Sequence, residues 1–217
     1  MPIGRMRDVL IMDAVLETYE AADFTLWPTA EQPADRLLAL SGDLSPLEVG
    51  TAMAVLAGYN KTQRTRHDPG PCDGLALLRR LVSVESVIAP GGLRLRDTAS
   101  GITVSPGCCF GLENWRDWLD LLDGETPWLG HDPAPDVEHS GSLVRLRPDA
   151  ERPAGPPVEL PLSELPVLLD SVRSALAGFV GLVGQWTERD FPPALAAQVV
   201  AKLDEGLGIG APLREVP

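Results

Sequence analysis

The sequence predicts an α+β fold in which short antiparallel strands pack with helices and a long helix pair forms the C-terminal end. Strand-like segments fall at about residues 81–105 and 137–160, and helical apolar spacing dominates on either side of them. With 217 residues and 44% hydrophobic residues, the chain can bury a proper core. We expect one α+β domain over 1–217; the alternative is a helical subdomain at 1–66 followed by an α+β domain at 74–217, with a break near 67–73.

The N-terminal third is predicted to be helical. Apolar side chains recur there at helical spacing, namely Val9, Met12, Val15, Leu16 and Tyr19. A second short helix is expected over Ala34–Leu40. The third is better marked, because Ser45 can serve as N-cap, Pro46 as the first helical residue and Glu48 as the partner in a capping box.

The middle of the chain is predicted to form a three-stranded antiparallel meander. Its expected strands are Leu81–Ile88, Leu93–Arg96 and Ile102–Val104. Turn signals separate them, with Pro90-Gly91-Gly92 before the second strand and Ser100-Gly101 before the third.

A second group of strands and two helices complete the predicted fold. Val137–His139 and Leu143–Arg147 flank a Ser-Gly turn and predict a hairpin, and Val158–Leu160 predicts a third strand. A long helix is expected from Ser163, the N-cap candidate, to about Trp186, and Pro192-Pro193 starts the last helix.

Glycines recur at every third position of the long helix, at Gly178, Gly181 and Gly184. Each costs up to about 1 kcal/mol of helix propensity relative to alanine. They indicate either a bend or the close approach of another element. A homo-oligomer formed through this face is one expectation.

Composition narrows the function classes. A formal net charge of −13 disfavours binding to phosphate backbones, so we expect no nucleic-acid partner. Three cysteines without a regular framework argue against a disulfide-stapled secreted domain. The apolar run Val9–Met12 is short for a signal peptide, and the uncharged run Ser174–Thr187 is short for a membrane span. We therefore expect a cytoplasmic protein that does not engage a membrane. The abundance of arginine, alanine, proline and glycine is typical of a GC-rich bacterial coding sequence.

The expected helix Leu112–Leu122 carries the leading functional prediction. Its inward stripe would be apolar, with Leu112, Trp115, Leu119 and Leu122, and its outward face would present Glu113, Asp117 and Asp120. Trp118 would lie at the margin between the faces, and Trp128 follows soon after. Acids beside aromatic residues suit a protein interface. These five residues predict a non-catalytic surface for a basic protein partner; a bacterial immunity protein that covers a basic toxin is one version.

The alternative is a thiol-dependent hydrolase or redox protein that uses the adjacent Cys108 and Cys109. The segment Gly107–Gly111 matches the G-x-[S/C]-x-G nucleophile elbow, with Cys109 as nucleophile, Asp120 or Asp132 as acid and His139 as base. Pro106 interrupts the link from strand to elbow, and the preceding strands do not follow a βαβ pattern, so the hydrolase is the weaker prediction.

No residue pattern predicts a metal or a cofactor. The soft ligands available are His67, Cys72, the two adjacent cysteines, His131 and His139, and none has C-x₂₋₄-C or H-x₃₋₅-H spacing. His67 and His131 each precede Asp-Pro, a turn context. We therefore expect neither a metal site nor a cofactor.

Overall fold

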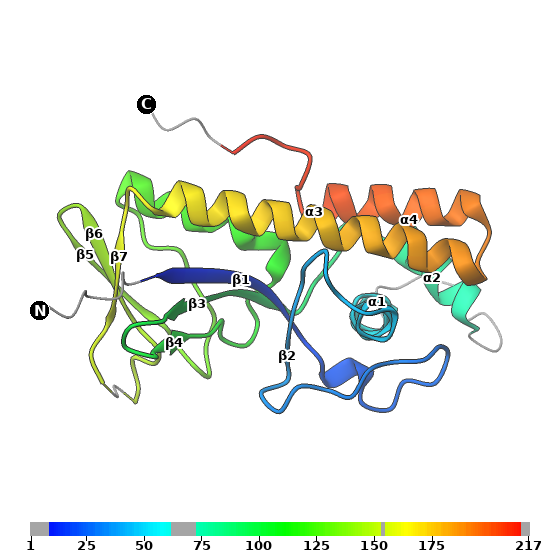
Figure 1. The fold of residues 1–217 in the computed structure, drawn as a ribbon, viewed down its shortest axis with the longest axis horizontal. Coiled ribbons are helices and arrows are strands. Elements are labelled where there is room, and N and C mark those ends of the chain that lie inside the picture. The colour runs from blue at the N-terminus through cyan, green and yellow to red at the C-terminus, as the bar shows by residue number, and fades with distance from the viewer. Residues whose placement is uncertain (1–8, 62–72, 153–154, 214–217) are drawn as a thin grey trace, which may run out of the picture.

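A computed structural model describes residues 9–61, 73–152 and 155–213 and has the predicted α+β fold (Figure 1). Two small antiparallel sheets pack with helices, and the two C-terminal helices form the expected pair. The domain break expected near residues 67–73 lies almost wholly outside the described residues, as do His67 and Cys72.

The first sheet is built around a strand that the sequence does not predict. β1 (Leu10–Glu17) lies between β2 (Leu37–Ala39) and β3 (Gly91–Asp97), and β4 (Thr103–Val104) pairs with the outer edge of β3. All neighbours are antiparallel. The two helices predicted over Val9–Tyr19 and Ala34–Leu40 are therefore wrong, apart from one short 3₁₀ turn, η1 (Tyr19–Ala21).

The central helix of the molecule is predicted correctly. α1 (Pro46–Asn60) begins at Ser45, whose hydroxyl accepts the Glu48 N–H, while the Glu48 carboxylate accepts the Ser45 N–H at 2.7 Å. This is the expected capping box. Most of α1 is buried, and Figure 1 views it nearly end-on below the C-terminal helices.

The first strand of the expected meander, Leu81–Ile88, is wrong: its first three residues belong to a helix, and residues 84–88 are in neither helix nor strand. α2 (Gly74–Ser83) begins at Asp73, whose side chain accepts the Ala76 N–H at 2.7 Å. Only β3 and β4 of the meander are present, and the place of the third strand is taken by β1.

The second sheet follows the prediction closely. β5 (Asp136–Ser140), β6 (Leu143–Arg147) and β7 (Val158–Pro161) form an antiparallel sheet in that order. It lies at one end of the molecule, away from α1 and α2 (Figure 1).

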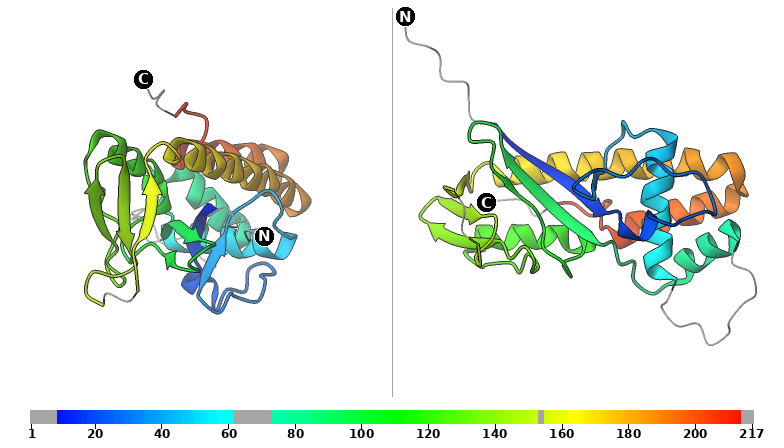
Figure 2. Two further views of the ribbon diagram at one scale, coloured as in Figure 1. Left: turned by 60° about the vertical axis from the view of Figure 1, so that its left-hand side comes forward. Right: turned by 90° about the horizontal axis from the view of Figure 1, so that it is seen from below.

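The C-terminal helices run along the molecule. α3 (Leu165–Asp190) packs on β1, α1 and α4 (Pro193–Gly206), as the views in Figure 2 also show. By length and apolar composition alone α3 could cross a membrane, which by itself is weak evidence for a span, and a third of its most apolar stretch is buried within the fold. The fold is thus compatible with a soluble protein.

Two of the three α3 glycines allow close contacts with other segments of the same chain. A Cβ on Gly178 would lie 2.8 Å from the Gly42 Cα, and a Cβ on Gly184 would lie 3.2 Å from a Val200 methyl group. Gly181 faces open space. The close approach that the glycines indicate therefore occurs within this chain at Gly178 and Gly184, and a homo-oligomer stays a prediction.

Candidate functional site

The helix that carries the predicted acidic face is a 3₁₀ helix rather than an α-helix. η2 (Leu112–Asp123) repeats every three residues, so positions i and i+3 share a face. Its fully buried face is Leu112, Trp115, Trp118 and Leu121. The expected position of Trp118 at the surface margin is therefore wrong: Trp118 is 1% exposed and belongs to the core.

The same change of period rearranges the acids. Asp117, Asp120 and Asp123 follow one another at spacing three and form a line along η2, which we call the acidic row. Asp117 and Asp123 are exposed and Asp120 is partly exposed. Glu113 does not belong to the acidic row, because four residues separate it from Asp117.

Glu113 instead forms a contact within the fold. Its carboxylate accepts the N–H of buried Ala89 at 2.8 Å, next to a backbone bond from the Leu112 N–H to the Ala89 carbonyl. Burial raises the pKa of Glu113, and the Ala89 hydrogen bond opposes that rise. The side chain folds back over Gly111, where a Cβ would lie 2.2 Å from a Glu113 carboxylate oxygen. Glu113 thus ties the start of η2 to the segment before β3.

The first two acids of the row, Asp117 and Asp120, are neighbours on one face of η2. The pKa of Asp117 is raised, first by burial and then by the Asp120 carboxylate. Neither Asp117 nor Asp120 has a salt-bridge partner among the residues that the structure describes. Arg116, the lone basic residue of 113–138, donates instead to the carbonyls of the C-terminal segment, at Gly208, Ala211 and Pro212.

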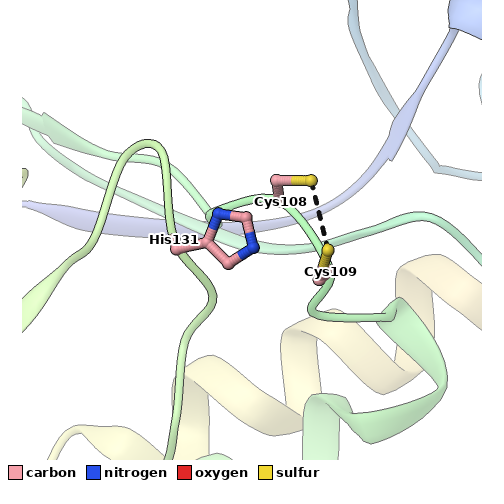
Figure 3. A group of neighbouring side chains, drawn as sticks. All are labelled: Cys108, Cys109 and His131. Carbon is pink, nitrogen blue, oxygen red and sulfur yellow. Dashed lines mark hydrogen bonds between the residues drawn. The ribbon is translucent and has the colours of Figure 1, made fainter.

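The second candidate site is the loop before η2. Cys108 and Cys109 are exposed, and their sulfurs are 3.4 Å apart. His131 joins them, so that one ligand atom from each of the three residues lies within 4.8 Å of the others. Figure 3 shows the imidazole beside both cysteines. We call these three residues the thiol–imidazole cluster.

Paired backbones hold this cluster together. The Cys108 N–H donates to the His131 carbonyl at 2.6 Å, and the His131 N–H donates back to the Cys108 carbonyl at 3.1 Å. Beside this bridge, Gly107 and Gly130 approach so closely that a Cβ on Gly130 would lie 2.5 Å from the Gly107 carbonyl carbon. Gly130 also has a φ of 97°, which favours glycine.

Trp128 lies with the cysteine loop. Its ring centroid is 6.4 Å from that of Phe110 and 6.5 Å from that of His131, and the residue is 58% exposed. Trp118 and Trp128, which the sequence places together beside the acids, are thus separated into one core residue and one surface residue.

The predicted hydrolase constellation is arranged differently. The histidine that joins the cysteines is His131, whereas Nε2 of His139 lies 3.1 Å from the Glu125 carbonyl oxygen. Asp120 is on η2, in the acidic row. The hydrogen bond with Cys109 raises the pKa of Cys108, desolvation and the negative charges of Cys109 and Glu17 raise it further, and a backbone hydrogen bond at Cys109 opposes the rise. A raised thiol pKa works against Cys108 as a nucleophile near neutral pH.

The chain matches no protein-family model, no curated protein and no solved structure. Its function has to be inferred from the acidic row and the thiol–imidazole cluster themselves.

Proposed function

We propose that the protein is a non-catalytic binding domain that uses the acidic row to engage a basic protein. One observation carries this proposal: Asp117 and Asp120 adjoin at the surface, while Arg116 is committed to carbonyls elsewhere. The chain thus keeps two like charges side by side although a basic residue precedes them directly.

That arrangement works against the stability of the free protein. Like charges three or four residues apart on a helix cost roughly 0.2–0.5 kcal/mol. Acids in the last turn also oppose the helix dipole. A lysine or arginine supplied by a partner would relieve both costs, so the unfavourable local choice is consistent with a binding role.

The charge of the whole chain supports the same kind of partner. Residues 108–217 carry 18 acidic and 8 basic side chains, and the net charge is −13. Such a field attracts a basic protein over distance and speeds association with it. A cytoplasmic bacterial immunity protein that covers a basic toxin is one concrete version of this function.

Capture of partners from the source cells tests the proposal. The tagged chain should retain a stoichiometric basic protein at low salt and release it at high salt. The charge-reversal variant Asp117→Lys/Asp120→Lys should fail to retain it. The matched control is Glu188→Lys/Asp190→Lys, which makes the same charge change at exposed positions at the end of α3 and should bind as wild type does. Equal capture by both variants would show that the acidic row is not the binding surface.

A further inference from the structure

We propose that Cys108, Cys109 and His131 form a site for a single thiophilic metal ion, Zn²⁺ or Cu⁺. This site is distinct from the acidic row and goes beyond the binding function proposed above. It does not follow from residue spacing, because the histidine lies 22 positions after Cys109 in the chain.

The donor set has the chemistry that such ions select. Thiolate and imidazole ligands favour Zn²⁺ and Cu⁺ over the hard ions Mg²⁺ and Ca²⁺, which prefer oxygen. The two cysteine sulfurs and one histidine nitrogen would occupy three coordination positions of the metal ion. The fourth position of a tetrahedral zinc ion would be left for water or for a ligand from another molecule.

The distances require only small adjustments. Two thiolates bound to one zinc ion at about 2.3 Å and at the tetrahedral angle lie roughly 3.8 Å apart. The two sulfurs are 3.4 Å apart in the chain, so they need to separate by a few tenths of an ångström. The imidazole must approach further, because the ligand atoms of the cluster spread over as much as 4.8 Å. The side chain of His131 is 56% exposed and has room to turn.

The orientation of the ring suits this role. The nitrogen farther from the Cβ, Nε2, faces the cysteines in Figure 3. The Asp132 carboxylate lies 3.9 Å from the other nitrogen, Nδ1. That distance is longer than a hydrogen bond. A small movement of either exposed side chain would let the Nδ1–H donate to the carboxylate, an arrangement that leaves Nε2 available for the metal.

The backbone brings the ligands together before any ion binds. The two hydrogen bonds between Cys108 and His131 and the contact of Gly107 with Gly130 join the two ligand-bearing segments directly. Side-chain burial does not account for the grouping, because both cysteines are exposed. The cluster is thus held by the backbone, with its sulfurs and its nitrogen open to solvent.

Metal titration of the full chain tests this proposal. The protein, kept reduced with a phosphine, is titrated with Co²⁺ while thiolate-to-metal charge-transfer absorption is recorded; Zn²⁺ is then added as competitor, and a separate titration uses Cu⁺. We expect one equivalent to bind and the absorption to show thiolate ligation. Each of Cys108→Ser, Cys109→Ser and His131→Ala should weaken binding by about tenfold or more. The ion that binds more tightly against a calibrated chelator identifies which of the two the site prefers.

Matched controls make the result decisive. Cys72→Ser and His139→Ala remove the remaining cysteine and a histidine that contacts Glu125 instead, and both should bind metal as wild type does. Circular dichroism checks that every variant is folded. Absence of thiolate ligation in the folded wild-type protein would overturn the proposal. So would undiminished binding by the cysteine or His131 variants, or loss of binding in Cys72→Ser.

Discussion

Replacement of Glu113 distinguishes a structural acid from the acidic row that follows it. In Glu113→Ala, the Ala89 N–H loses its acceptor, and Ala89 is completely buried. An unsatisfied buried donor costs about 1–3 kcal/mol. Glu113 itself is only partly buried, so water can reach some of the vacated space, and we expect a loss of about 2 kcal/mol in the free energy of unfolding.

The conservative variant separates hydrogen bonding from charge. Glu113→Gln retains a side-chain carbonyl that can accept the Ala89 N–H. It also removes a carboxylate whose charged form is disfavoured by burial. We therefore expect Glu113→Gln to lose much less stability than Glu113→Ala.

The pH dependence gives a second signature with a definite sign. Because the pKa of Glu113 is raised in the folded protein, the folded state holds this proton more tightly than the unfolded state. The contribution of this group to stability is therefore present at low pH and is lost as the pH rises through the folded pKa. Glu113→Gln has no carboxyl group to ionise and does not lose stability in this way. The free energy of unfolding of Glu113→Gln should therefore improve relative to that of wild type as the pH rises from about 4 towards neutrality.

Urea and thermal unfolding measure these differences. For a chain of this size, 2 kcal/mol corresponds to a fall in Tm of about 4–8 °C. Asp117→Ala, at an exposed position of the same helix, is the control and should change little. A Glu113→Ala variant as stable as wild type would refute the assignment of Glu113 to the fold and would return it to the candidate binding surface.

Three further predictions concern the scaffold, and each is checked by the free energy of unfolding in urea. Ser45→Ala removes the capping box of α1 and should cost about 1 kcal/mol; no change would mean that the cap is dispensable. Asn60→Ala removes a buried amide that forms hydrogen bonds with both the N–H and the carbonyl of Ile88, and it should lower the free energy of unfolding by about 3 kcal/mol. A smaller decrease than that of Ser45→Ala would contradict a structural role for this amide. Gly178→Ala should cost about 1–3 kcal/mol because its Cβ meets another backbone, whereas Gly181→Ala, in open space on the same helix, should gain up to about 1 kcal/mol; equal effects would contradict the packing described.

The helix signals with a local cause could be predicted from the sequence, and the first strand could not. The capping box at Ser45 and the hairpin of β5 and β6 depend on neighbouring residues and are present as predicted. In β1, the three consecutive residues Ala14–Leu16 are completely buried. A strand enclosed by other elements loses its alternation, and its apolar spacing then fits a helix equally well. For α2, Asp73 is a local sequence signal for the start of a helix. The valines that follow Leu81 favour a strand instead, so the sequence predicts a strand there.

The candidate site was predicted in part for similar reasons. The acids and cysteines were found as clusters, because they are adjacent in the chain. The three-residue period of η2 could not be predicted, because an α-helix is the common expectation and long 3₁₀ helices are unusual. The roles of Glu113 and His131 depend on Ala89 and Cys108, more than 20 residues away in each case. Pairings at that distance carry no local sequence signal.

The most direct test of the acidic row is the association rate with the captured partner, measured against ionic strength for wild type and the two charge-reversal variants. We predict fast association for wild type that slows steeply with added salt. We predict slower association with a weaker salt dependence for Asp117→Lys/Asp120→Lys, and a rate much closer to that of wild type for Glu188→Lys/Asp190→Lys, although both variants change the net charge equally. If both variants slow association equally, the effect belongs to the net charge of the protein, and a specific binding role for Asp117 and Asp120 is contradicted.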